Sequence, residues 1–250
     1  MTARYEHTTD GPARGSLRLL QLYPRDMNIY GDWGNTLVLA RRAQWQGYDV
    51  ELLSYDPGDE LPGDVDVLVG GGGQDSGQNR IKEDLVKVGP TLKAWAADGV
   101  PMLAICGLYQ LFGHGFTTAK GQEIPGISLM DAHTVAGDTR LIGNITLDTE
   151  DFGAVVGYEN HSGLTTLGPG ARPFGTVRMG DGNNGKDSEG GRVHHVIGTY
   201  LHGSLLPKNP AVADWLLARA AEHAGAAWEP EPLDDAWAER ARAVAMSRPR

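Results

Sequence analysis

The chain contains one cysteine, Cys106, in the stretch AICGLYQLFG. Apolar residues lead into it, and Gly107 and a helix-like pattern follow. This order is typical of a nucleophile elbow, a strained strand-to-helix turn that presents a thiol above the carboxyl end of a sheet. The helix N-terminus beyond it favours the reactive thiolate. The alternative is an ordinary buried thiol at a strand end, because free cysteine is among the most buried residue types.

The residues flanking Cys106 give conflicting evidence on whether this stretch forms an elbow. An elbow needs small residues two positions before and two positions after the nucleophile, because strand and helix pass close together there. Ala104 meets this requirement and Leu108 does not. Leu108 therefore keeps open the interpretation that the chain is a degenerate enzyme retained as a binding subunit.

A thiolate nucleophile needs a partner that carries protons, usually histidine. His202 is the best placed of the eight histidines, because it directly follows the strand-like run VIGTYL. Ligands of open α/β sheets gather beyond the carboxyl ends of the strands, so Cys106 and His202 are expected on the same rim. His194 and His195 fall within the same expected strand, 193–203, which is typical of structural residues.

Two glycine-rich stretches have different expected roles. In VGGGGQD, residues 69–75, the glycines let backbone N–H groups turn toward an oxyanion, although a flexible turn is an equal alternative. GDGNNGKDS, residues 180–188, has the spacing of a phosphate loop. Asp187 occupies its hydroxyl position and no helix pattern follows, so we predict a polar hairpin and no ATP site.

The bulk composition limits the classes of function. The net charge is −10 and the pI is about 5.2, which argue against nucleic acid or an anionic membrane as a direct partner. One cysteine allows no internal disulfide and no two-cysteine zinc site, so we predict no metal site. No signal-peptide pattern and no apolar run of about 18 residues is visible, which predicts a cytoplasmic protein without a membrane span.

The elements that position these residues follow from hydrophobic periodicity. The first half alternates strands and helices at the spacing of βαβ units, which predicts a parallel sheet. The expected strands are 16–24, 49–55, 64–70 and 100–106, and the expected helices are 34–48, 80–98 and 107–115.

The second half reads as strands between glycine-rich turns, followed by a helix at 209–225. We therefore predict an α/β fold, a mostly parallel doubly wound sheet with an antiparallel extension. Its domain spans 16–225, after a loose tail at 1–15 and before a helical extension at 226–250.

Three motifs together resemble a known family. AICGLYQLFG, GYENHSG and GTYLHG, in this order, resemble the signatures of the class I (triad) glutamine amidotransferases, in the cobyric acid synthase branch. The resemblance spans roughly residues 16–224 and implies the class I glutamine amidotransferase-like fold. It implies the following site residues: Cys106 as nucleophile, His202 as catalytic base, Gly73 and Gly107 as oxyanion donors, and Arg140 and Gln110 as glutamine-binding residues.

The third member of the triad is missing from its usual place. Gly203 follows His202, where most class I enzymes have Pro-Glu. Either the catalytic unit is a Cys–His dyad, or an acid from elsewhere orients the imidazole. Glu159 and Asp26 are the two acids that we consider for this role.

The resemblance also implies a partner. Cobyric acid synthases carry an ATP-binding domain ahead of the glutaminase, where this chain has a short tail. It is therefore more similar to the free-standing glutaminase subunits of the branch, which act with a MurT-like Mur ligase subunit. That complex amidates the D-glutamate of the lipid II stem peptide to D-isoglutamine in peptidoglycan synthesis, at the inner face of the membrane. The implied substrate is L-glutamine, with no cofactor in this chain and with ATP and Mg in the partner subunit.

Two other functions remain open. One is the glutaminase subunit of another ATP-dependent amidation, such as cobyric acid synthesis. The other is a cysteine hydrolase of the DJ-1 type, which shares the elbow but has no need of the downstream GTYLHG motif.

Overall fold

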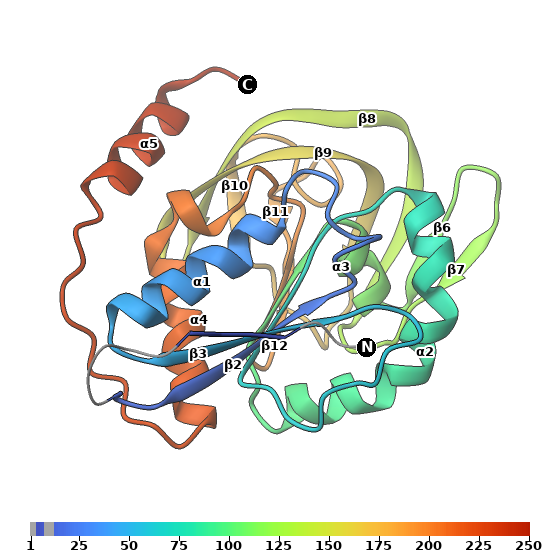
Figure 1. The fold of residues 1–250 in the computed structure, drawn as a ribbon. Helices are drawn as coiled ribbons and strands as arrows, with labels where there is room; N and C mark the ends of the chain where they lie inside the picture. Colours follow the sequence, from blue (N-terminus) through green and yellow to red (C-terminus); the bar gives the residue numbers. More distant parts are fainter. Residues whose placement is uncertain (1–3, 8–12) are drawn as a thin grey trace.

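The main sheet runs through the centre of the molecule (Figure 1). The computed structural model describes residues 4–7 and 13–250, and within them this sheet has seven strands in the order β1-β3-β2-β4-β5-β13-β12. Its five inner strands are parallel, as predicted: β2 (Ser16–Leu22), β3 (Asp49–Tyr55), β4 (Val67–Gly70), β5 (Met102–Ile105) and β13 (Val196–Thr199). Their carboxyl ends form one rim.

The two edge strands are antiparallel. They show that two predictions were wrong, the loose tail over residues 1–15 and the single strand over residues 193–203. β1 (Arg4–His7) pairs with β3, so residues 4–7 are not part of a loose tail; residues 1–3 and 8–12 lie outside the described part of the chain. β12 (Gly191–Val193) pairs with β13 in a hairpin. His194 and His195 therefore lie in a turn and not in a strand, and His194 has a left-handed φ of 49°.

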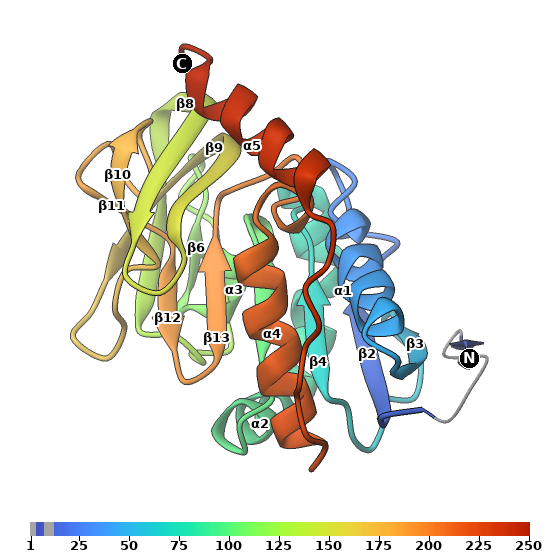
Figure 2. The same ribbon diagram turned by 90° about the vertical axis from the view of Figure 1, so that its left-hand side faces the viewer.

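Helices cover both faces of this sheet (Figures 1 and 2). α1 (Trp33–Trp45) and α4 (Pro210–His223) pack on one face, and α2 (Asp75–Ala97) and α3 (Gly107–Phe112) pack on the other. Their apolar residues recur at helical spacing, as in the buried series Ile81, Leu85, Val88 and Leu92 of α2. The doubly wound arrangement is confirmed.

The remaining strands form a second sheet beside the first. It contains β6 (Gly115–Thr117), β7 (Glu123–Pro125), β8 (Ala132–Thr149), β9 (Gly153–Leu167), β10 (Gly175–Met179) and β11 (Ser188–Glu189). The long β8–β9 pair dominates it and is antiparallel. Residues 180–187 join β10 to β11 in an antiparallel hairpin, as predicted for the stretch that mimics a phosphate loop.

The segment after α4 ends in helix α5 (Ala236–Ser247), which lies along the outside of the molecule (Figure 2). It contacts β9 and the short 3₁₀ helix η1 (Leu206–Lys208). Among the described helices, none is long and apolar enough to cross a membrane.

Candidate active site

Cys106 occupies a strained turn between β5 and α3. Its backbone has φ 51° and ψ −106°, a conformation that L-residues rarely adopt and that is held here by the strand before it and the helix after it. The Cys106 N–H donates to the carbonyl of Thr199 at 2.8 Å, which ties the turn to the end of β13. Cys106 is 9% exposed and lines a cavity at the rim of the sheet. This is the geometry predicted for an elbow.

Leu108 fits this elbow because the neighbouring strands lack side chains where the helix crosses them. Gly70 of β4 and Gly198 of β13 both pair with Ala104 of β5, which makes a row of small residues under α3. A methyl group on Gly70 would overlap Leu108, and one on Gly198 would overlap Tyr109. The glycines of the two neighbouring strands thus provide the space that the elbow needs, and Leu108 is compatible with an elbow at Cys106.

His202 follows β13 and lies on the same rim as Cys106. Its backbone exchanges two hydrogen bonds with Tyr158 of β9, at 2.8 and 3.3 Å, and its side chain is buried. A carboxylate upstream fixes the turn that leads to it: Glu189 accepts hydrogen bonds from the Tyr200 N–H at 2.6 Å and the Thr199 hydroxyl at 2.9 Å.

The charge of His202 is set by competing effects. Burial lowers its pKa, but the Cys106 sulfur and the Asp32 carboxylate together outweigh burial and raise the pKa to about 10. The side chains of Cys106 and His202 lie next to each other, beside Gly72. With this raised pKa, the His202 imidazole is expected to be charged at neutral pH.

Asp32 is the acid next to His202, and the sequence analysis missed it. Its Oδ1 lies 3.5 Å from His202 Nδ1, a long contact, and its Oδ2 accepts a 2.7 Å hydrogen bond from the Gly72 N–H. Asp32 is fully buried and lies at the start of α1, just beyond the carboxyl end of β2. Asp32 lies in the same connection between β2 and α1 as Asp26, the acid considered there from the sequence.

The two acids considered from the sequence have other partners. Glu159 points into the second sheet, where it accepts N–H bonds from Asp181 and Gly182 and pairs with Arg250 at 3.3 Å. Asp26 pairs with Arg80 at 2.5 Å. The structure brings neither carboxylate to His202, and we replace both with Asp32 as the candidate third member.

The glycine loop after β4 lies directly against Cys106 and His202. A Cβ on Gly72 would approach His202 Cε1 at 2.8 Å and Cys106 Cβ at 3.1 Å, so only glycine fits between them. The N–H of Gly72 is engaged by Asp32. The N–H groups of Gly73 and Gly107 have no acceptor among the described residues, and a Cβ on Gly107 would lie 3.1 Å from the Gly73 nitrogen. They remain the candidate oxyanion donors.

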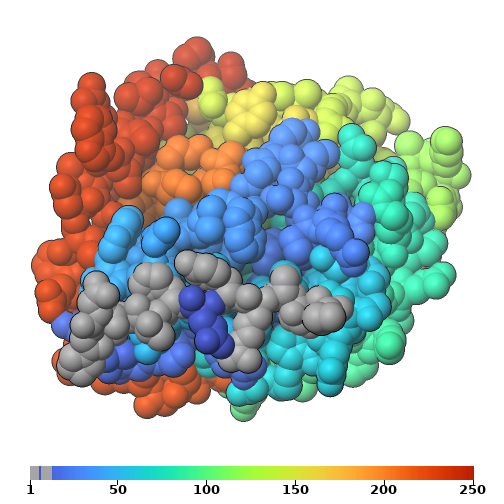
Figure 3. All heavy atoms as spheres, viewed as in Figure 1, coloured from blue at the N-terminus to red at the C-terminus, as the bar shows by residue number. Residues whose placement is uncertain are grey.

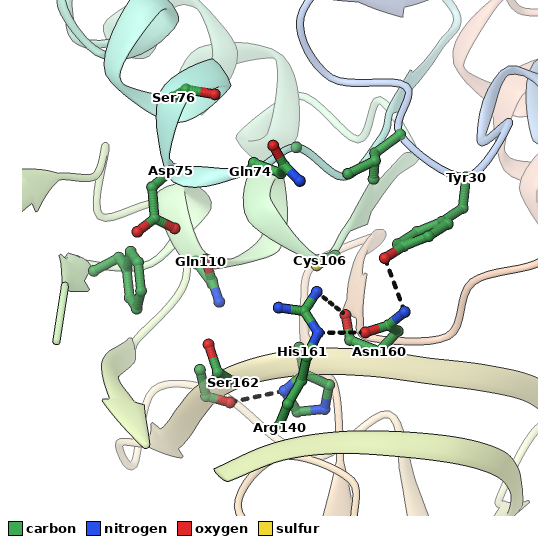
Figure 4. Close-up of a pocket in the computed structure, with 14 residues that line it drawn as sticks. Tyr30, Gln74, Asp75, Ser76, Cys106, Gln110, Arg140, Asn160, His161 and Ser162 are labelled. Carbon is green, nitrogen blue, oxygen red and sulfur yellow. Dashed lines mark hydrogen bonds between the residues drawn. The ribbon is translucent and has the colours of Figure 1, made fainter. Parts of the chain in front are cut away.

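A cavity of about 360 Å³ opens beside Cys106, a volume typical of small-molecule sites. Figure 4 shows Arg140, Asn160 and Tyr30 joined by hydrogen bonds on one side, facing Gln74, Asp75 and Ser76 on the other. Arg140 Nε donates to Asn160 Oδ1 at 2.6 Å, and Asn160 Nδ2 donates to the Tyr30 hydroxyl at 2.8 Å.

Arg140 reaches this cavity because β8 bulges there. The β8–β9 register jumps between Ala136 and Leu141, so residues 137–140 leave the ladder and project. Gln110 also lines the cavity, but both ends of its amide are engaged, by Gln78 at 2.6 Å and by the Tyr200 hydroxyl at 3.2 Å. It presents a fixed polar edge to a ligand.

His161 is a further lining residue that the sequence analysis did not select. Its ring stacks on Tyr200 at 3.6 Å, and its Nδ1 lies 2.8 Å from the Gly163 carbonyl. Burial lowers the pKa of His161 to about 4, so this imidazole is neutral where His202 is charged.

No group of three or more potential metal ligands occurs among residues 4–7 and 13–250. That this chain works without a cofactor stays a prediction.

The chain matches a family of known proteins. A sequence model of the CobB/CobQ-like glutamine amidotransferase domain matches residues 18–210. Similar curated proteins include the lipid II isoglutaminyl synthase (glutamine-hydrolyzing) subunit GatD of Staphylococcus aureus (strain N315), 36% identical over 89% of this chain and 91% of the relative. The GatD subunit of Streptococcus pneumoniae is 36% identical over 84% of this chain and 83% of that protein.

Other matches are more distant. Cobyric acid synthase of Sphingopyxis alaskensis is 30% identical over 73% of this chain but only 39% of its own length. Among solved structures, a glutamine amidotransferase of Thermotoga maritima superimposes with a TM-score of 0.54 at 16% identity, over 92% of this chain and 93% of that chain. This structural likeness concerns the fold alone.

Proposed function

The chain belongs to the CobB/CobQ-like glutamine amidotransferase family, and from this premise we propose that it is the glutaminase subunit of a lipid II isoglutaminyl synthase. The observation that carries the glutaminase proposal is the buried set of Cys106, His202 and Asp32 against a glycine loop, beside a cavity of about 360 Å³. The similarity to GatD over most of both chains supports the particular synthase.

The first half of the proposed reaction releases ammonia. The Cys106 thiolate attacks the side-chain amide carbon of L-glutamine, and the C–O π electrons move to the oxygen, which the N–H groups of Gly73 and Gly107 stabilise. When the tetrahedral intermediate collapses, the C–N bond breaks. His202 transfers its proton to the departing nitrogen, which leaves as ammonia and leaves a γ-glutamyl thioester on Cys106.

The second half regenerates the thiolate. Neutral His202 takes a proton from water, whose oxygen attacks the thioester carbon. The C–S bond then breaks, glutamate is released and the imidazolium–thiolate pair is restored. Asp32 holds the imidazole through Nδ1 during both proton transfers, in the manner of a catalytic triad.

The substrate is held by the polar side of the cavity. Arg140 presents a guanidinium from the β8 bulge, and its forked N–H groups match the α-carboxylate of glutamine. Gln110 contributes its fixed amide at the cavity wall.

The ammonia is used by a second subunit. Forming an amide from a free carboxylate is uphill, so the acceptor must first be activated. We assign this step to a MurT-like Mur ligase subunit with ATP and Mg, acting on the D-glutamate of lipid II in the cytoplasm at the inner membrane face. The name of the relatives as GatD subunits supports a partner. The cobyric acid alternative is less favoured, because the GatD subunit of Staphylococcus aureus is 36% identical over 89% of this chain and the cobyric acid synthase is 30% identical over 73% of it. The family match disfavours a DJ-1-like hydrolase.

Nitrogen transfer in the reconstituted complex tests this function. With amide-¹⁵N-glutamine, ATP and lipid II, the wild-type complex should place ¹⁵N in the product. Cys106→Ala should lose that transfer and regain product formation with added ¹⁵N-ammonium. The proposal fails if the variant still uses glutamine, or if wild-type complex makes no amidated lipid II from either nitrogen source.

A further inference from the structure

Helix α5 is firmly anchored at both ends. Before it, the buried Arg42 of α1 binds Asp235 at 2.5 and 3.0 Å and Asp214 of α4 at 2.7 and 2.8 Å. After it, Asn144 donates to the Pro249 carbonyl at 2.7 Å, and Arg250 donates to Asp181 at 2.9 Å. These contacts fix the position of α5 against the main body.

Between its anchors, α5 buries no residue. Trp237 is 75% exposed and Val244 is 46% exposed, although a helix that packs on its own domain normally buries one apolar face. Figure 3 shows α5 in red at the edge of the molecule. Part-buried ion pairs therefore hold a helix of which only Ala238, Arg242 and Ala245 are half-buried.

Two grooves border this helix. The first, of about 540 Å³, runs between α5 and β9, and Tyr158 lines it. The second, of about 400 Å³, runs between α5 and α1 and is mostly apolar, with Leu37, Trp45 and Pro207 among its lining residues. Trp237 lines both grooves. Exposed tryptophans beside apolar grooves are typical of protein interfaces.

The first groove is also basic. Lys208, Arg240 and Arg248 line it, and none of the three forms an ion pair with a carboxylate within the described ranges. Burial and nearby Arg248 lower the pKa of Lys208, and both residues line this groove. Residues 236–250 contain four arginines and one glutamate in a chain of net charge −10. The charge of this face therefore fits an acidic partner.

The grooves connect to the active site through one strand. Tyr158 lines the basic groove, and its backbone exchanges hydrogen bonds with His202. A protein that settles in the groove therefore contacts the residue that fixes the backbone of His202.

We propose that α5 and its two grooves form a docking platform for the ligase subunit. The matching surface of the ligase consists of apolar side chains bordered by carboxylates. This inference rests on the proposed function. Trp237 and Trp45 are its apolar anchors, and Lys208, Arg240 and Arg248 pair with the acidic border. The partner completes the packing that α5 lacks in the isolated chain.

Matched variants test the platform. On α5, Arg240→Glu reverses an unpaired charge and Val244→Asp alters an exposed apolar residue. On α2, far from α5 in Figure 1, Lys87→Glu and Val86→Asp are the controls, since Val86 and Val244 are each 46% exposed. Calorimetric titration with the purified Mur-ligase-like protein of the same organism should give Kd values about tenfold or more weaker for the α5 variants and unchanged for the α2 variants. Because neither α5 residue is buried, melting temperatures should match the wild type.

The outcomes separate the two proposals. If wild-type chain binds the ligase and all four variants bind equally well, the platform is wrong and the proposed function stands. If wild-type chain does not bind the ligase at all, both fail. If light scattering shows that wild-type chain self-associates, and the α5 variants lose only that self-association, the occupant is a second copy and the platform proposal is overturned.

Discussion

At the scale of single residues, the site depends on one unusual contact, the 3.5 Å approach of Asp32 to His202. Asp32 also accepts the Gly72 N–H, so one buried carboxylate connects the imidazole to the oxyanion loop. We propose that Asp32 takes the place of the acid that is absent after His202, although it lies 170 residues earlier in the sequence.

Asp32→Asn should lower kcat for glutamine hydrolysis by about tenfold or more, because an amide orients the imidazole poorly and does not stabilise its charge. KM should change little, since Asp32 does not line the cavity. Steady-state ammonia release measures both. Asp26→Asn is the control and should leave kcat unchanged; a larger loss there than at Asp32 would restore Asp26 as the third member.

The pKa of His202 predicts a pH dependence of stability. The unfolded histidine titrates near pH 6.5 and the folded one near 10. The folded chain holds this proton more tightly, so the stabilisation is complete below about pH 6.5 and is lost as pH rises towards 10. Denaturant titrations of wild type and His202→Asn should show a difference in unfolding free energy that shrinks across this range. A difference independent of pH would show that the imidazole is not held as a cation.

Arg140→Ala should raise the KM for glutamine by about tenfold or more with little change in kcat. The substitution removes a contact to glutamine that is equally strong in the bound substrate and in the transition state. Arg178→Ala, which removes an exposed arginine paired with Asp148, should leave KM unchanged. Equal KM values for wild type and Arg140→Ala would return Arg140 to the role of a surface residue that holds Asn160.

At the scale of elements, the elbow is a property of three strands and not of one motif. Its small residues are Gly70, Ala104 and Gly198, one on each of β4, β5 and β13. The motif around Cys106 therefore tolerates Leu108, because the compensating glycine lies on the neighbouring strand.

A double-mutant cycle tests this compensation. Gly70→Ala should destabilise the chain by about 1–3 kcal/mol, since the added methyl overlaps Leu108. In a Leu108→Ala background, which itself leaves a cavity, the same change should cost far less. Chemical denaturation measures the four free energies of unfolding, and additive effects would mean that the two residues do not share this space.

The sequence predicts the parallel sheet, the helices and the elbow well, because each depends on local periodicity and on glycine placement. It does not predict that the antiparallel strands separate into a second sheet, since that depends on which strands pair across long distances. Asp32 was missed for a similar reason: nothing near it in sequence identifies it, and only the order of β2 beside β4 brings it to Gly72 and His202.

At the scale of the whole molecule, two features sit at the same upper side of the fold in Figures 1 and 2, the carboxyl-end rim of the parallel strands and helix α5. A glutaminase that supplies ammonia to another subunit needs both a site for glutamine and a surface for its partner. Tyr158 joins them, because it lines the basic groove and holds the backbone of His202.

The most direct test of the central claim is to trap the covalent intermediate. Purified complex is mixed with glutamine, quenched in acid within one turnover, digested and analysed by mass spectrometry. We predict a γ-glutamyl group on the peptide that contains Cys106, lost on treatment with hydroxylamine and absent from Cys106→Ala. Ammonia release by the wild type without any such adduct, or by Cys106→Ala at a comparable rate, would contradict the account.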